Sequence, residues 1–211
     1  MKKKNKLNYA FYDFFLFTAG LPLMIWCRPK HIYETEKAKE KIKGGAIVIA
    51  NHSGLVDPLV LAMGISYRRH HFVATTELFN SKLKRFMFER ANCIEIDRQN
   101  VSMQSFNKII EHLNAGRLVS MFPEGRMTKN EEVQTFKSGM VLMALRANVP
   151  IIPVYIKRRK NYWQRQKYVI GEPINPVEMV GKIPSLEKIN QVTNLLKEKE
   201  AELKKIADQY K

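Results

Sequence analysis

The chain has 211 residues, enough for one domain with a substantial apolar core. It carries 36 lysines and arginines against 20 aspartates and glutamates, a formal net charge of +16, and 45% of its residues are hydrophobic. This composition excludes a disordered basic protein, and the charge favours nucleic acid, a membrane surface or an anionic substrate as partner. Cys27 and Cys93 provide no disulfide framework and the histidines show no zinc spacing, so we expect a reducing location and no metal.

The N-terminus combines positive charge with an apolar stretch. Lysines crowd residues 2–6, and an aromatic-rich apolar run follows from Leu7 to Cys27. No signal-peptide cleavage site is evident, and Asp13, Gly20 and Pro22 interrupt a clean transmembrane span. We therefore predict two short helices, broken near Gly20-Leu21-Pro22, that lie in the membrane interface with the lysines toward anionic head groups. The alternative is a core helix of a soluble domain.

The rest of the chain alternates between predicted strands and helices. Residues 31–44 are charged and end in Gly44-Gly45, which predicts a linker. Strands are predicted at 46–50, 72–75, 93–98, 118–122 and 149–156, and helices from 58, at 81–90, 100–115 and 139–147, and from 185 to the end. This rhythm predicts an α/β fold, a single mixed sheet flanked by helices, over residues 31–211, with residues 1–30 as a membrane-associated helical segment.

Two basic segments can each be interpreted in two ways. Residues 81–90 predict a basic helix with Leu83, Phe86 and Met87 on one face, which suits either a solvated surface or contact with lipid. Residues 157–167 surround Tyr162 and Trp163 with lysines and arginines, a mixture that suits stacking on nucleic acid or anchoring at a membrane interface. No nucleic-acid recognition signature accompanies them, so we expect no nucleic-acid partner.

His52 and Asp57 are the first candidates for chemistry. The apolar run Ala46–Ala50 predicts a buried strand, and Asp57-Pro58 predicts a helix start with Asp57 at the N-cap. His52 therefore follows the carboxyl end of a strand, where α/β sheets bind ligands. An aspartate that holds one imidazole nitrogen leaves the other to take a proton. We interpret His52 as a general base and Asp57 as its orienter; on spacing alone, a capping aspartate and a loop histidine remain the alternative.

Two further predicted strand ends carry polar groups. One is Asp97-Arg98 and the other is Glu124-Gly125-Arg126. Arg98 and Arg126 can each bind a phosphate through two hydrogen bonds, and Gly125 permits a close backbone approach. Because three clusters follow three strand-like runs, we expect one site that binds a phosphate-bearing molecule.

Four blocks in this order resemble a known family. They are Asn51-His52-x-x-x-x-Asp57, Ile96-Asp97-Arg98, Phe122-Pro123-Glu124-Gly125 and Val149-Pro150-Ile151-Ile152-Pro153, and they are similar to those of the glycerolipid acyltransferases, most closely the bacterial 1-acyl-sn-glycerol-3-phosphate acyltransferases. The resemblance implies an α/β core and a membrane-associated N-terminal segment. It also implies that His52 and Asp57 are the catalytic pair, that Arg98, Glu124 and Gly125 bind the glycerol-phosphate end of the acceptor, and that Pro153 shapes the acyl-donor side.

The chain departs from the family pattern at two places. Gly125 is followed by Arg126-Met127-Thr128 where Thr-Arg is usual, and Thr75-Thr76 stands where a lysine often precedes Glu77-Leu78. Arg126 and Lys137 are therefore added as candidate phosphate ligands. Backbone N–H groups near Gly54 or Gly125 are both candidates for stabilising an oxyanion.

The resemblance implies transfer of a fatty acyl group from acyl-CoA or acyl-carrier protein to the hydroxyl of lysophosphatidic acid, which makes phosphatidic acid without a further cofactor. Another lysophospholipid or glycerol 3-phosphate is the alternative acceptor, and a hydrolase with the same His/Asp pair is the alternative enzyme. The expected partners are lysophosphatidic acid, the acyl donor and an anionic bilayer. The expected location is the cytoplasmic side of the cell membrane, as a peripheral or monotopic protein.

Overall fold

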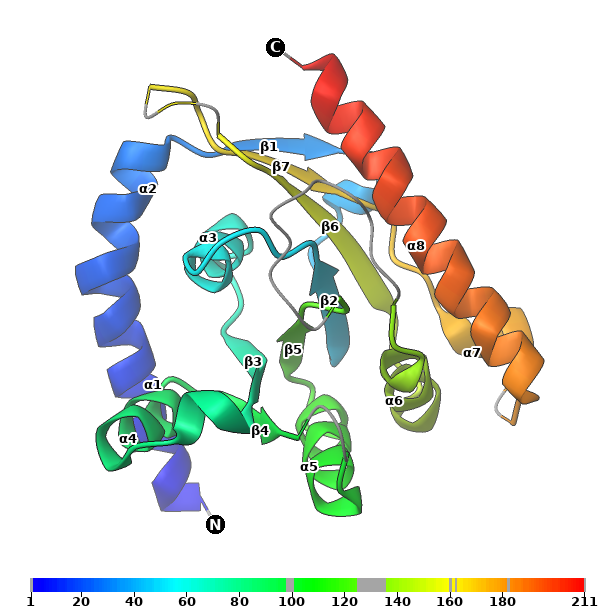
Figure 1. The fold of residues 1–211 in the computed structure, drawn as a ribbon, viewed down its shortest axis with the longest axis horizontal. Coiled ribbons are helices and arrows are strands. Elements are labelled where there is room, and N and C mark those ends of the chain that lie inside the picture. Colours follow the sequence, from blue (N-terminus) through cyan, green and yellow to red (C-terminus); the bar gives the residue numbers. More distant parts are fainter. Residues whose placement is uncertain are drawn as a thin grey trace.

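The computed structural model describes residues 2–97, 101–124, 136–159, 161, 163–181 and 183–210, with side chains described from Tyr9 onward. Within these residues, seven strands form one mixed sheet in the order β1-β7-β6-β2-β5-β3-β4 (Figure 1). The strands are β1 (Lys30–Tyr33), β2 (Ala46–Ala50), β3 (His70–Thr75), β4 (Ile94–Ile96), β5 (Leu118–Met121), β6 (Ile151–Lys157) and β7 (Lys167–Ile170). Neighbours are parallel except β6 and β7, which are antiparallel.

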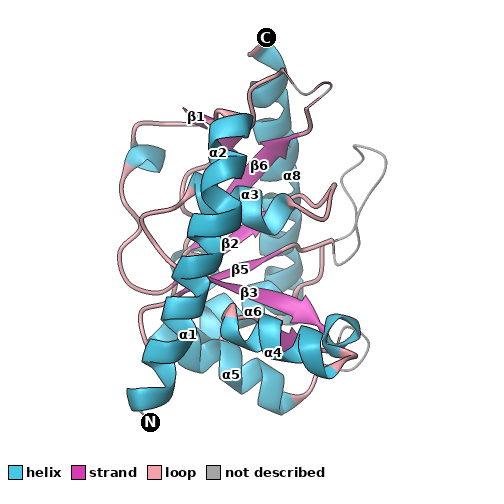
Figure 2. Cartoon of the chain, turned by 90° about the vertical axis from the view of Figure 1, so that its left-hand side faces the viewer, coloured by secondary structure: helices cyan, strands magenta, loops and turns pink. Residues whose placement is uncertain are grey.

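Helices cover both faces of this sheet, so the predicted α/β class is confirmed. They are α1 (Lys2–Phe15), the π-helical segment η1 (Leu16–Gly20), α2 (Leu21–Cys27), α3 (Asp57–Gly64), α4 (Lys82–Arg90), α5 (Met103–Asn114), α6 (Gly139–Ala147), α7 (Pro176–Val180) and α8 (Leu186–Gln209), with one-turn 3-10 helices η2 (Lys37–Lys39) and η3 (Thr76–Phe79). One face packs against α5, α6 and α8, and the other against α3, with the N-terminal helix outside α3 (Figures 1 and 2).

The central position of β2 in the sheet explains why its sequence contains no polar residue. It is hydrogen-bonded to β5 on one side and β6 on the other, and all five of its residues are buried. Ile47 and Ile49 enter the core shared with α5, α6 and α8, whereas Val48 enters the core beneath α3. A strand covered on both faces needs apolar side chains at every position rather than at alternate ones.

The N-terminal helix is continuous, so the predicted break near Gly20-Leu21-Pro22 is wrong. Pro22 has no N–H and its ring crowds the preceding turn, but a π-helical turn absorbs the conflict, with the N–H of Leu21 donating to the carbonyl of Leu16. The backbone therefore stays helical through the proline, because one wide turn re-pairs the groups that the proline would leave unsatisfied.

This helix has two different faces. Tyr12, Gly20 and Cys27 are buried, and Gly20 lies so close to α3 that a Cβ there would come within 2.7 Å of Met63 Sδ. The opposite face presents exposed apolar side chains at helical spacing, namely Phe14, Phe17, Leu21 and Ile25. Among the described residues, Tyr9–Cys27 is the one helix long and apolar enough to cross a membrane by length and composition. The buried face nevertheless fixes it to the domain.

Three elements were not predicted. Residues 31–44 are not a plain linker, because β1 lies at their start and pairs in parallel with β7. Neither β7 nor α7 has a periodic signal, since each is short and is stabilised by packing against other elements, β7 by β1 and β6 and α7 by α6 and α8. At Gly45, just before β2, the backbone passes close to Leu113. A Cβ at this position would lie 2.2 Å from the carbonyl oxygen of Leu113. The predicted helix at Gly139–Ala147 is confirmed to the residue.

Candidate active site

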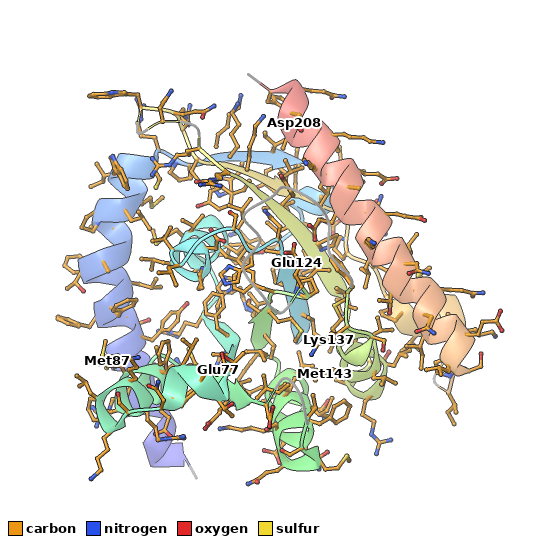
Figure 3. All side chains as sticks on the ribbon, viewed as in Figure 1. Glu77, Met87, Glu124, Lys137, Met143 and Asp208 are labelled. Atoms are coloured by element: carbon orange, nitrogen blue, oxygen red, sulfur yellow. The ribbon has the colours of Figure 1, made fainter. Side chains whose placement is uncertain are left out.

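The parallel strands deliver the predicted polar groups to one edge of the sheet. Strands β2, β5, β3 and β4 all run in the same direction, so their carboxyl ends lie together. His52 follows β2, Glu124 follows β5 and Asp97 follows β4. Figure 3 places Glu124 over the centre of the sheet and Lys137 at the start of α6. The site is therefore assembled from strand ends, as open α/β sheets commonly do.

Asp57 holds His52 in the orientation expected of a general base. Asp57 Oδ2 lies 3.0 Å from His52 Nδ1, and it also accepts hydrogen bonds from the backbone N–H groups of Ser53, at 2.6 Å, and Gly54, at 2.7 Å. The aspartate is buried, and the imidazole is partly buried. With a carboxylate at Nδ1, the proton of neutral His52 is held on that nitrogen, and Nε2 is the atom that can accept another.

This geometry bears on two alternatives that the sequence left open, the role of Asp57 and the choice of oxyanion ligand. Asp57 is the first residue of α3 and Val56 the N-cap, so the predicted capping role is wrong: the carboxylate points back to the 52–54 loop instead of forward to the helix. The backbone N–H of Gly54 is directed at Asp57, which disfavours it as an oxyanion ligand. The other candidate, Gly125, lies outside the described residues.

Two residues near His52, Phe122 and Asn51, make contacts that the sequence did not predict. The Phe122 ring stacks on the imidazole of His52, with ring centroids 4.2 Å apart. Asn51 links β2 to β6, since its Nδ2 donates to the carbonyl of Ile156 at 3.0 Å and its Oδ1 accepts the N–H of the same residue at 2.7 Å. Both residues stand in the recognised blocks, but only the tertiary structure shows what each touches.

Among the remaining described histidines, His70 and His71 are buried in the core. His70 and His71 lie at the amino end of β3, the opposite edge from His52. Burial lowers the pKa of His70 to about 4 and that of His71 to about 3, so both are neutral at physiological pH. His70 Nδ1 lies 2.7 Å from Ser120 Oγ, while His31 Nε2 lies 2.9 Å from the carbonyl of Gly64.

A largely apolar cavity of about 240 Å³ opens beside His52. Its polar lining includes His52 and Lys137, which places these two predicted residues at one cavity. Its apolar lining comes from β3, η3, α4, β4, β5 and α6, including Phe72, Leu78, Phe88, Met121, Met140 and Met143. The cavity also contacts Cys93, and burial raises the pKa of this thiol to about 12, so it stays protonated. An unbranched alkyl chain is the kind of ligand that such a lining suits.

Glu124 is buried near a second carboxylate that the sequence did not single out. Glu200 lies on the buried side of α8, between Leu196 and Leu203 along the helix. Burial, with the charge of Glu124, raises the pKa of Glu200 to about 8.

The predicted ligands Arg98, Gly125 and Arg126 lie outside the described residues. No group of three or more histidine, cysteine, aspartate or glutamate side chains that could hold a metal ion occurs in the part of the chain that is described.

Comparison with known proteins identifies the family of this chain. Residues 30–157 match the family model described as acyltransferase, and the chain belongs to that family. A relative named 1-acyl-sn-glycerol-3-phosphate acyltransferase, from Bacillus subtilis, is 28% identical over 170 residues, which cover 78% of this chain and 84% of the relative. A Mycoplasma pneumoniae protein named as a probable enzyme of the same kind is 25% identical, covering 82% of this chain and 69% of that protein.

A solved structure shares the fold. The 1-acyl-sn-glycerophosphate (LPA) acyltransferase PlsC from Thermotoga maritima superposes with a TM-score of 0.63 at 22% identity, covering 97% of this chain and 84% of that one.

Proposed function

We propose that this chain transfers a fatty acyl group from a thioester donor to the hydroxyl of 1-acyl-sn-glycerol 3-phosphate, producing phosphatidic acid. The observation that carries the proposal is the His52–Asp57 pair, joined at 3.0 Å, at the side of a cavity with an apolar lining. Family membership supports acyl transfer, and the names of the relatives support lysophosphatidic acid as the acceptor.

In the proposed reaction, His52 Nε2 takes the proton of the acceptor hydroxyl while that oxygen attacks the thioester carbonyl. The new C–O ester bond forms and the C–S bond breaks. The departing thiolate then takes the proton from the imidazolium. Asp57 stabilises the imidazolium between these two steps, and general-base catalysis of this kind contributes roughly 10²–10⁴-fold to the rate. No covalent acyl-enzyme intermediate is needed.

In this proposal the acyl donor and the acceptor bind at different parts of the site. The acyl chain enters the apolar lining, which brings its thioester carbonyl to His52. Lys137, on the same lining, holds the acceptor phosphate together with Arg98 and Arg126, while Glu124 and Gly125 bind the glycerol side. Holding both reactants in place contributes more to the rate than the base alone.

We further propose that the enzyme is a peripheral or monotopic protein on the cytoplasmic side of the cell membrane. The outward apolar face of the N-terminal helix supports bilayer contact, and its buried face against α3 supports a fixed position of that helix on the domain. Acyl-CoA or acyl-carrier protein then approaches from the cytoplasm, and lysophosphatidic acid from the bilayer.

An acceptor panel tests the proposal. Labelled acyl-CoA and labelled acyl-carrier protein are each supplied with lysophosphatidic acid, other lysophospholipids or glycerol 3-phosphate, and phospholipid and free fatty acid are both measured. We expect phosphatidic acid with lysophosphatidic acid, and almost no product from His52→Ala. Preferred acylation of another acceptor would contradict the choice of lysophosphatidic acid, and release of fatty acid alone would identify a hydrolase.

A further inference from the structure

Helix α4 exposes apolar side chains to an unusual degree. None of its nine residues is buried, and Leu83, Phe86 and Met87 are 70%, 47% and 43% exposed. These three lie at positions i, i+3 and i+4, so they form one continuous face, which we name the α4 face. Each of the three keeps more than two fifths of its surface exposed among the described residues.

The contacts of α4 within the domain leave this apolar face largely exposed. Isolated helices as short as α4 are marginal in water, and most helical stability in proteins comes from packing an apolar face. In α4, Phe88 contacts the ring of Phe79 and lines the cavity, and Ser81 caps the first turn. The α4 face takes no part in these contacts, so its apolar character points to a partner outside the chain.

The α4 face belongs to a helix that neighbours a surface already described. Helix α1 packs beside α4, and both lie on the same side of the molecule (Figure 2). Met87 lies at the outer edge of α4, next to the N-terminal helix (Figure 3). The outward row of the N-terminal helix, which includes Phe14 and Phe17, is exposed as well. Two neighbouring helices thus present apolar side chains outward.

The charges around the α4 face identify the kind of partner. Lys82 and Lys84 are exposed on the same helix, whereas Arg85 is paired with Glu95 at 2.6 Å. The guanidinium of Arg90 lies 4.2 Å from the centre of the Phe86 ring, so a cation borders the apolar face directly. Aromatic and aliphatic side chains bordered by cations suit an anionic bilayer, where the apolar part enters below the head groups.

We propose that α4 is a second bilayer contact, which inserts Leu83, Phe86 and Met87 into an anionic membrane next to the N-terminal helix. An acidic protein would also meet the lysines, but it would not account for the exposed apolar row on the neighbouring N-terminal helix. Leu78 and Phe88, from the same segment of the chain, line the cavity beside His52. The contact therefore lies at the rim of the cavity, and, if the proposed function holds, a lysophospholipid passes from bilayer to site beside α4.

Vesicle binding by the full-length protein tests this. The variant carries Leu83→Gln, Phe86→Gln and Met87→Gln, and the matched control carries Met179→Gln, Ile183→Gln and Leu186→Gln, three exposed apolar residues near α7 and α8 on the far side of the molecule (Figure 1). Both are sedimented with phosphatidylcholine vesicles that contain phosphatidylglycerol. We expect the α4 variant to bind roughly tenfold more weakly or worse, and the control within about twofold of the wild type.

A second measurement reports insertion directly. Phe86→Trp is made in a Trp26→Phe, Trp163→Phe background, and its emission should shift to the blue when anionic vesicles are added. Circular dichroism melting checks that each variant folds. The proposal is overturned if the tryptophan emission does not shift, or if the α4 variant binds vesicles like the wild type. Binding is measured without turnover, so failure to acylate lysophosphatidic acid would refute the proposed function alone.

Discussion

Phe122 lies nearly parallel to the imidazole of His52, with the two ring planes 19° apart. The imidazole is thereby fixed on its edge by Asp57 and on its face by Phe122, which follows directly from β5. A second ring, that of Phe72 in the neighbouring strand β3, is stacked on Phe122, with the two ring centroids 6.5 Å apart. The orientation of the proposed base therefore depends on two neighbouring strands as well as on its own loop.

Phe122→Ala should lower kcat by roughly tenfold to a hundredfold, because loss of the ring frees the imidazole to tilt from the reacting hydroxyl. Phe122→Tyr keeps the ring and should restore most of the activity. The KM of the acceptor should change little in either variant. A rise in KM with unchanged kcat would show that Phe122 serves substrate binding instead.

Asp57→Asn should lower kcat by about 10²–10⁴-fold, because an amide lacks the charge that stabilises the imidazolium. The fold should survive, since the amide oxygen can still accept the N–H groups of Ser53 and Gly54. Steady-state acyl transfer and thermal melting, measured on the same preparation, separate the two effects. A kcat within tenfold of the wild type would exclude Asp57 as the orienting carboxylate.

Met143→Phe should shift acyl preference toward shorter chains. Met143 is buried in the cavity lining, and a rigid ring there occupies volume that the flexible thioether can yield to a chain. Competition between acyl-CoA donors of different lengths measures the shift. Leu142→Phe, at an exposed neighbouring position of α6 outside the cavity lining, is the matched control and should leave the preference unchanged. An unaltered preference in Met143→Phe would place the acyl chain elsewhere.

Gly45→Ala should destabilise the protein by about 2 kcal/mol or more, because the new Cβ meets the Leu113 carbonyl oxygen at 2.2 Å and the backbone must shift. Gly139→Ala is the control: a Cβ at this first residue of α6 meets nothing within 4 Å. Alanine there should leave the stability within about 0.5 kcal/mol of the wild type, since the larger cost of glycine applies to helix interiors and Gly139 is a first residue. Urea unfolding checks both values, and equal stabilities would contradict the described packing around Gly45.

Glu200→Gln should stabilise the protein more at pH 8 than at pH 5. The pKa of Glu200 is raised to about 8 by burial and then by Glu124, against an ordinary value of 4.5. Between these values the unfolded chain has lost this proton while the folded chain keeps it, so wild-type stability falls as pH rises, on the order of 1 kcal/mol per pH unit. The variant lacks this loss. Melting temperatures of the two proteins that keep a constant difference across this range would refute the shift.

The sequence by itself determined the parts whose signal is local. The apolar run Ala46–Ala50 is a buried central strand, and the helix at Gly139–Ala147 begins and ends where its pattern predicts. His52 and Asp57 were also predicted as a pair, because the four residues between them let an aspartate reach back to the histidine in a tight strand-to-helix turn. Local conformation and hydrophobic burial act over a few residues, so they can be read from a few residues.

Tertiary structure decided the features that depend on distant partners. β1 is a short edge strand that pairs only with β7, far along the chain, among the described residues. The stacking of Phe122 on His52, the cavity, and the proximity of Glu200 to Glu124 each join residues from separate elements. The N-terminal helix stays unbroken at Pro22 within a chain that packs it on α3. These features depend on which elements pack together, because a contact between two elements stabilises the protein only when both elements are in place.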